Sequence, residues 1–293
     1  SMLIALDTLK PQAACTNTGK SATALIPAGK QEIGAANWWD SEPRPLLAIE
    51  AGANETGESG LVPAAYRLFE FIFSALALLL TLPIMIVVAI MIKLDSPGPI
   101  LFFMQRLGRS RIVRGADLIG RRDIAPVSGD FDPEKSYYVP TTFTFVKFRT
   151  MHADSYERFP ELYRRRYESY DELLADYCKK DDDPRVTRVG RWLRKLTIDE
   201  FPNFWNVLTG SIGLVGPRPD GLFYAAFYKA EDMRKFTVRP GITGLAQING
   251  RGHLSIGQTN AWDLKYVRER SVALDLRILL RTFILVVTRH GAF

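Results

Sequence analysis

The longest apolar run of the chain covers residues 71–92, with the sequence FIFSALALLLTLPIMIVVAIMI, and it contains no charged residue. At a rise of about 1.5 Å per residue, a helix of this length crosses a hydrocarbon layer of roughly 30 Å. A helix at the surface of a soluble protein would carry a polar face. The run therefore predicts a membrane helix, with a buried helix of a soluble protein as the alternative.

Pro83 lies near the middle of this run. A proline inside a helix removes a backbone hydrogen bond and kinks the helix. The helix therefore either crosses the membrane with a kink, or enters it, turns at Leu82 and Pro83, and leaves on the same side. Basic residues are more frequent after the run than before it, which places the C-terminal part in the cytoplasm in both cases. These residues are Arg67 before the run and Lys93, Arg106, Arg109, Arg111 and Arg114 after it.

Two polar segments lie outside the regular patterns. Residues 1–64 have no sustained hydrophobic period, and we expect an irregular N-terminal extension that packs on the body or on a second subunit. No apolar stretch follows a basic start there, which argues against a signal peptide. Residues 110–140 are polar and contain glycine, as is typical of an inserted loop. We therefore expect three parts: the extension, a membrane hairpin at 65–95, and a cytoplasmic catalytic domain at 96–293.

The sequence TTFTFVKFRTM at 141–151 alternates with a period of two, which predicts a β-strand. Phe143, Phe145, Lys147 and Arg149 then share one face of the strand. Two apolar residues followed by two cations suit a strand that begins in the core and ends at an anion. The alternative is a half-exposed strand whose charged side chains are solvated.

Arginine recurs every third residue just before a pair of acids. Four arginines at this spacing cover about half of a helical wheel. They form either a solvated basic face or a surface that meets a ligand. The four are Arg185, Arg188, Arg191 and Arg194.

The acids Asp199 and Glu200 lie next to each other before an apolar helical pattern. Thr197 and Glu200 match the capping box, in which a threonine side chain caps the helix and the glutamate bonds back to it. Either helix start, Thr197 or Asp199, places both acids at a helix N-terminus. There a carboxylate stays ionised and can act as a nucleophile or hold a divalent cation. The pair alone does not decide between capping and catalysis.

The helix after the acids is indicated by apolar residues at helical spacing, with Gly210 as its end. These residues are Phe201, Phe204, Trp205 and Leu208. The apolar stretch 271–287 near the C-terminus contains Arg277 and Arg281. It predicts either an amphipathic helix in the membrane interface or a core helix that ends the domain.

Three turns hold an arginine next to proline or glycine. Arg218 lies between two prolines, Arg239 precedes Pro-Gly, and Arg251 lies in the sequence NGRG. A rigid backbone presents a guanidinium at low entropic cost, and a guanidinium suits a phosphate. The mild net charge of +6 agrees with anionic membranes or phosphate-bearing ligands and fits nucleic acid less specifically. Two cysteines and three dispersed histidines give neither a disulfide framework nor a histidine zinc site.

Four segments in order resemble the bacterial sugar transferase family, the monotopic phosphoglycosyl transferases, from about residue 65 to the C-terminus. They are SPGPILFFMQRLGR, KFRTM, DPRVTRVGRWLRKLTIDEFPNFWNVLTGSIGLVGPRP and RPGITGLAQINGR. The resemblance implies transfer of a sugar phosphate from a UDP-sugar to polyprenyl (undecaprenyl) phosphate, with release of UMP, as the first membrane step of polysaccharide or glycoconjugate assembly. It also implies a requirement for Mg²⁺.

For the residues, the resemblance implies that Asp199 attacks phosphorus and forms a covalent phosphosugar intermediate, that Glu200 assists, and that the metal lies beside Asp199. The phosphate-binding candidates are Lys147, Arg149, Arg194, Arg218, Arg239 and Arg251. The implied fold is α+β and helix-rich: a re-entrant helix-break-helix with its break at Pro83, and a cytoplasmic domain with amphipathic interfacial helices and a small β-hairpin or sheet. The implied location is the cytoplasmic face of the bacterial inner membrane.

The expected partners are a UDP-sugar, polyprenyl phosphate, membrane lipids and a second copy of the chain, without nucleic acid. Two hypotheses of other classes remain: a non-enzymatic membrane scaffold whose basic patches bind anionic lipids, and a metal-dependent phosphohydrolase. The sequence leaves open which sugar is transferred.

Overall fold

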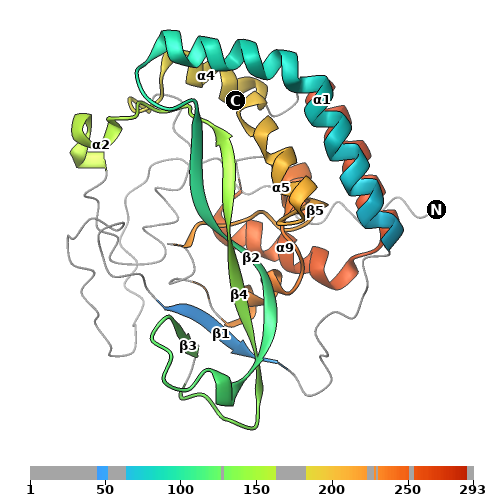
Figure 1. The fold of residues 1–293 in the computed structure, drawn as a ribbon. Coiled ribbons are helices and arrows are strands. Elements are labelled where there is room, and N and C mark those ends of the chain that lie inside the picture. Colours follow the sequence, from blue (N-terminus) through green and yellow to red (C-terminus); the bar gives the residue numbers. More distant parts are fainter. Residues whose placement is uncertain are drawn as a thin grey trace, which may run out of the picture.

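The structure is a computed structural model that combines helices with two small sheets, as the sequence predicts (Figure 1). It describes residues 45–51, 64–126, 129–162, 183–222, 228, 230–250 and 254–288.

The apolar run lies in helix α1, Ala64–Asp95, which contains Pro83 and bends near its middle (Figure 1). The Thr81 hydroxyl donates to the Ala77 carbonyl at 2.6 Å, a bond that also favours bending. The helix is long and apolar enough to cross a membrane, and only 11% of its most hydrophobic window is buried. The alternative, a helix buried in the core of a soluble protein, is therefore wrong. A bent continuous helix agrees with both membrane topologies, and the re-entrant hairpin stays a prediction.

The larger sheet is built on a long antiparallel pair, β2 (Leu101–Arg114) and β4 (Ser136–Phe148). The strand predicted at 141–151 is thus confirmed for 141–148. It begins earlier, at Ser136, and ends before Arg149. β1 (Leu46–Glu50) and β3 (Ile124–Pro126) complete the order β2-β4-β1-β3.

These short strands correct two expectations. Residues 46–50 are not irregular, because β1 pairs with β4 and β3. Residues 110–140 are not a single inserted loop, because they contain the end of β2, all of β3 and the start of β4. The two segments build a small core of their own, which explains why polar sequences without a clear period fold here. Its buried members are Ala48, Leu118, Ile124, Tyr137 and Val139.

The rest of the chain is mostly short helices around a parallel pair of strands, β5 (Gly213–Val215) and β6 (Gly241–Thr243). The α-helices are α2 (Ser155–Arg158), α4 (Arg188–Leu196), α5 (Phe204–Thr209), α7 (Ala230–Met233), α8 (Leu245–Gly250), α9 (Ile256–Glu269) and α10 (Val272–Thr288). The 3₁₀ turns are η1 (Gly115–Asp117), η2 (Pro160–Leu162), η3 (Ile198–Asn203) and η4 (Arg234–Thr237). The main core forms where β5, β6, α9 and α10 meet.

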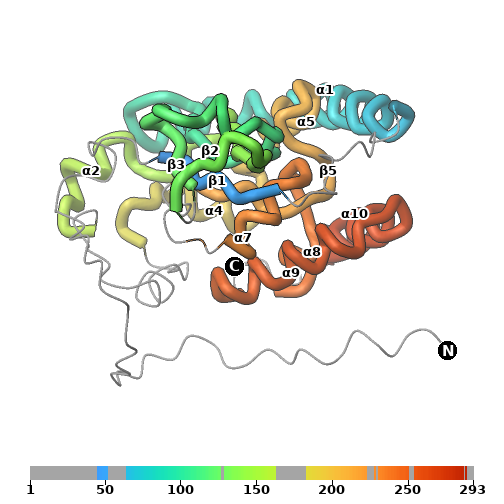
Figure 2. The backbone as a smooth tube through the Cα atoms, turned by 90° about the horizontal axis from the view of Figure 1, so that it is seen from below, coloured from blue at the N-terminus to red at the C-terminus, as the bar shows by residue number. Residues whose placement is uncertain are grey.

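α10 has two different faces. Ile278 is fully buried, whereas Leu276, Leu280 and Phe283 are more than half exposed. α10 thus packs one face against the main core and leaves an apolar face exposed, so each of the two alternatives describes part of it. α10 extends in the same direction as the N-terminal half of α1 (Figures 1 and 2). Its position in a membrane interface stays a prediction.

Candidate active site

The backbone reverses sharply just before the two acids. Thr197 ends α4 in the left-handed conformation, with φ 58°, and its side chain makes no capping hydrogen bond to η3. The predicted capping box is therefore wrong. A β-branched residue in this conformation is strained and needs support from its surroundings. The turn places Asp199 and Glu200 in the first turn of η3, which confirms their position at a helix start, although the helix is 3₁₀.

The helix expected after the acids consists of η3 and α5, and Gly210 ends it with φ 87° as predicted. Its apolar residues do not all face the core: Trp205 is 55% exposed, and the Phe204 ring contacts Phe73 of α1. The buried Asn206 amide donates to Thr144 and its oxygen accepts from the Val146 N–H. These bonds fix the helix against β4, beside Lys147.

Lys147 and Arg194 bring positive charge to Asp199, which is 8% exposed. Burial lowers the pKa of Lys147 to about 8, against the opposing charges of Asp199 and Glu200. Burial also lowers the pKa of Arg194, against the charge of Asp199. The Arg194 Nε atom donates to the Thr150 hydroxyl at 2.9 Å, which fixes the guanidinium. The structure thus brings four sequence-predicted site residues together.

Of the four arginines at three-residue spacing, Arg194 is the one that lies beside the acid pair, where its charge interacts with Asp199. Arg188 and Arg191 are exposed, and Arg185 forms an ion pair with Asp183 at 2.7 Å. Most of the run is therefore a solvated or locally paired basic face, and one member, Arg194, lies beside the acid pair.

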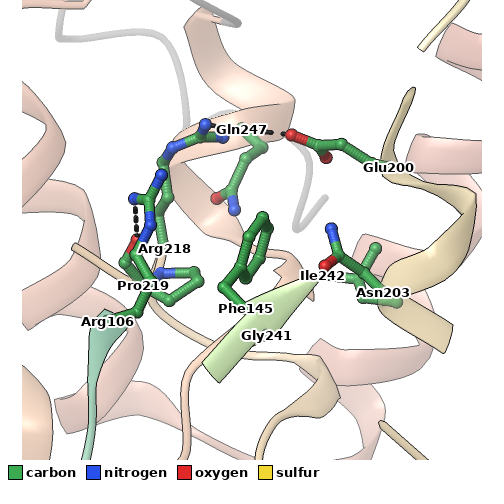
Figure 3. A pocket seen from close by; sticks show the side chains of 9 residues that line it. All are labelled: Arg106, Phe145, Glu200, Asn203, Arg218, Pro219, Gly241, Ile242 and Gln247. Atoms are coloured by element: carbon green, nitrogen blue, oxygen red, sulfur yellow. Dashed lines mark hydrogen bonds and ion pairs between the residues drawn. The ribbon is translucent and has the colours of Figure 1, made fainter. Parts of the chain in front are cut away.

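Arg218 reaches the same site from the turn after β5. Its guanidinium lies 3.9 Å from the Glu200 carboxylate, and both side chains line a small cavity (Figure 3). Arg106 donates to the Pro219 carbonyl at 2.6 Å and its guanidinium lies 5.0 Å from the Phe145 ring centre. β2 and β4 thereby hold the proline-bounded turn in place.

Arg149, just beyond β4, is used differently. Its guanidinium is buried and donates to the Ser96 hydroxyl, the Ser96 carbonyl and the Pro99 carbonyl. It thereby fixes the turn that follows α1. The structure does not bring it to the acid pair.

Arg239 is also engaged elsewhere. It donates to the Glu70 carboxylate of α1 at 2.8 Å, and Glu70 is only 1% exposed. Glu70 also accepts from the Leu214 N–H and pairs with Arg67, which donates to the Val207 carbonyl. This cluster joins α1 to the part of the chain that carries the acid pair. Arg251 lies outside the described residues.

A buried polar network behind the Arg218 turn was missed by the sequence reasoning. Lys235 pairs with Asp220, donates to Asn260 at 2.6 Å, and lies 3.9 Å from Asp263. Burial raises the pKa of Asp263 to about 7, opposed by Lys235. Burial also disfavours ionisation of Asp220, but Lys235 lowers its pKa overall. The position of Asp220 directly after Pro-Arg-Pro was the available signal.

Among the described residues, no group of three or more acids, histidines or cysteines could hold a metal ion on its own. Mg²⁺ commonly binds one or two carboxylates together with substrate phosphates. Asp199 and Glu200 fit this mode, because they are adjacent, at a helix start, and close to candidate phosphate-binding cations.

The model of the bacterial sugar transferase family matches residues 62–113 and 134–289. Undecaprenyl-phosphate glucose phosphotransferase of Komagataeibacter xylinus is 34% identical over 240 residues, 78% of this chain and 36% of that protein. ExoY, an exopolysaccharide production protein of Rhizobium meliloti, is 30% identical over 229 residues, 78% of this chain and 88% of its own. UDP-glucose:undecaprenyl-phosphate glucose-1-phosphate transferase of Escherichia coli is 32% identical over 236 residues. The aligned region spans 78% of this chain but 41% of the Escherichia coli protein.

Proposed function

Because the chain belongs to the bacterial sugar transferase family, we propose that it transfers a sugar phosphate from a UDP-sugar to polyprenyl phosphate and releases UMP. The observation that carries the proposal is the acid pair, Asp199 and Glu200, held at a tight helix start among Lys147, Arg194 and Arg218. Phosphoryl transfer needs a positioned nucleophile and cations that stabilise the charged phosphates. The names of the relatives supply the substrate class.

In this proposal the Asp199 carboxylate attacks the phosphorus that carries the sugar, and the bond from this phosphorus to the UMP oxygen breaks. UMP leaves with the bonding electron pair. A phosphate oxygen of polyprenyl phosphate then attacks the same phosphorus, which breaks the bond to Asp199 and restores the carboxylate. Lys147, Arg194 and Arg218 offset the negative charge of the phosphates, and Glu200 positions groups or moves a proton.

Mg²⁺ would be held by Asp199, next to Glu200, and would supply positive charge to the pyrophosphate of the donor. If Asp199 is both nucleophile and metal ligand, one of its carboxylate oxygens attacks phosphorus and the other binds Mg²⁺.

We further propose that α1 lies in the bacterial inner membrane as a re-entrant hairpin and that the catalytic domain lies on its cytoplasmic face. The exposed apolar residues of α1 and α10 support contact with lipid. Labelling of Ala64→Cys and Arg111→Cys, in a chain with Cys15→Ser and Cys178→Ser, tests the topology. A re-entrant hairpin makes both new cysteines reactive from one side, whereas reaction from opposite sides would show a spanning helix. The homodimer remains a prediction.

The activity is tested by incubating the membrane-bound protein with UDP-sugars and undecaprenyl phosphate and measuring UMP. We expect Asp199→Asn to reduce UMP release by roughly a thousandfold or more, because the amide is a poor nucleophile. Asp117→Asn, on the distant turn η1, is the matched control and should retain activity. Normal turnover by Asp199→Asn would refute the nucleophile assignment.

The same assay separates the two other hypotheses. A phosphohydrolase would release free sugar phosphate without the lipid acceptor. A scaffold would bind anionic lipid in a salt-sensitive manner, release no UMP, and tolerate loss of both acids.

A further inference from the structure

The cavity beside the acid pair is small, and its wall combines polar and apolar side chains. It has a volume of about 10 Å³, and Glu200, Arg218, Asn203, Gln247 and Phe145 contribute to its wall. These residues come from η3, the turn after β5, α8 and β4, so that the cavity lies where separate parts of the chain meet (Figure 3). A cavity of this size admits about one water-sized group.

Two carboxamides in this wall have buried atoms without hydrogen-bond partners. Asn203 is 1% exposed, and its side-chain oxygen has no partner within the part of the chain that the structure describes. The same holds for both the nitrogen and the oxygen of the Gln247 amide. Because both Gln247 atoms lack a partner, this statement does not depend on which end of the amide is the oxygen. Buried polar atoms of this kind are rare in folded proteins and call for a partner.

The chemistry of the amides restricts what that partner can be. The Gln247 oxygen needs a hydrogen-bond donor, and its nitrogen needs an acceptor. An ionised phosphate oxygen only accepts, so it would leave the amide oxygen without a partner. A hydroxyl group both donates and accepts and is the size of one water, so it meets both requirements.

We propose that Gln247 and Asn203 bind a hydroxyl group of the sugar-nucleotide donor and thereby contribute to the choice of donor. This inference rests on the proposed function. Glu200 and Arg218 line the same cavity, which places the hydroxyl next to the reacting phosphates. The transferred sugar and the ribose of UDP both carry such hydroxyls, and the experiment distinguishes them.

The test compares wild type with Gln247→Met, which keeps the approximate volume and removes the hydrogen bonds. Each protein is given a donor that the wild type turns over, and analogues of it that each lack one hydroxyl, on the transferred sugar or at the ribose 2′ or 3′ position. For the complete donor we expect Gln247→Met to reduce kcat/KM for UMP release by roughly tenfold. For one deoxy analogue, Gln247→Met and wild type should have the same kcat/KM, because this analogue lacks the hydroxyl that Gln247 binds.

The position of that analogue identifies the source: the transferred sugar or the ribose. Asn203→Leu should reproduce the pattern at the same hydroxyl. Gln105→Met is the matched control, since Gln105 donates to Thr144 on the exposed side of the sheet and should leave kcat/KM unchanged for every donor.

If the losses from Gln247→Met and from each missing hydroxyl multiply for all analogues, the inference is overturned, and the amides serve a water or the fold. Such multiplicative losses would leave the proposed function intact, provided that the wild type releases UMP from the complete donor. If no UDP-sugar yields UMP with the wild type, the proposed function fails and the inference falls with it.

Discussion

Two turns of similar sequence, Pro217–Arg218–Pro219 and Arg239–Pro240–Gly241, carry their arginines to different places. Their backbones are directly joined, since the Gly241 N–H donates to the Pro217 carbonyl at 2.9 Å. Arg218 nevertheless lines the cavity at Glu200, whereas Arg239 bonds to the buried Glu70 of α1. One turn contributes to the site and the other fastens the site to α1.

The difference shows what a rigid turn can and cannot determine. Proline restricts the backbone and so limits the entropy lost when the arginine is fixed. The direction of the side chain is decided by the carboxylate that the rest of the fold supplies. Lys147 and Arg149, at the end of β4 and just beyond it, show the same contrast. Lys147 lies near Asp199, and Arg149 fixes the turn after α1.

Among the tests of this comparison, the largest effect should come from Arg239→Met, which leaves the charge of Glu70 buried with Arg67 as its remaining ion-pair partner among the described residues. We expect a loss of about 3 kcal/mol in stability, because breaking a buried ion pair is costly. Thermal unfolding in nanodiscs measures it. The pair Glu70→Gln with Arg239→Met should lose less than Arg239→Met alone. An unchanged melting temperature for Arg239→Met would show that the ion pair between Arg239 and Glu70 does not stabilise the fold.

Arg218→Lys should act on turnover instead of stability. We expect kcat/KM for UMP release to fall by about ten- to a hundredfold, because an ammonium cannot reproduce the two-point geometry of a guanidinium on phosphate. Kinetics with a fixed UDP-sugar measure it, with the melting temperature as the control. If Arg218→Lys instead lowers the stability strongly and leaves kcat/KM unaltered, Arg218 serves the fold and not the reaction.

Asp263→Asn tests the network behind the Arg218 turn. The raised pKa of Asp263, about 7, means that the folded protein holds a proton that the unfolded chain releases near pH 4. This carboxyl therefore makes wild-type stability decline as pH rises from about 4 to 7, and level off above that. The variant should gain on the order of 1–2 kcal/mol relative to wild type between pH 5 and pH 8. Parallel stability curves for the two proteins would contradict this.

The smallest effect should be a change in the pH profile of Lys147→Arg. The Lys147 pKa of about 8 predicts that wild-type activity declines as pH rises through that value, because the cation beside Asp199 is lost. Arginine remains charged, so the decline should move to higher pH, while kcat/KM at pH 7 falls only about threefold. The matched change Arg149→Lys should leave the pH profile unaltered. An identical alkaline limb in Lys147→Arg would show that another group causes the decline.

Local patterns were sufficient for several elements. The uncharged run at 71–92 predicts α1, the alternation at 141–151 predicts β4, and Gly210 ends the helix that follows the acids. Each of these depends on residues that are close in sequence, through helical spacing, strand alternation or a left-handed glycine. The motif order also indicated the family, and within it the acid pair and Arg218.

Other assignments depended on contacts between distant residues. The capping box failed because Thr197 closes the preceding helix, and β1 was missed because its partners lie about 75 to 90 residues later. The partners of Arg149 and Arg239, the Lys235 network and the two amides of the cavity arise only when α1, β5, η4, α8 and α9 pack together.

The sequence by itself determined the long apolar helix, the main strand, the position of the acid pair at a helix start and the family, because these rest on period, composition and the order of short motifs. Tertiary structure alone decided which cations meet the acids and which fasten the fold. A charged side chain has the same local sequence signal in both roles. Its role depends on whether a distant carboxylate, a carbonyl or an open cavity lies within its reach.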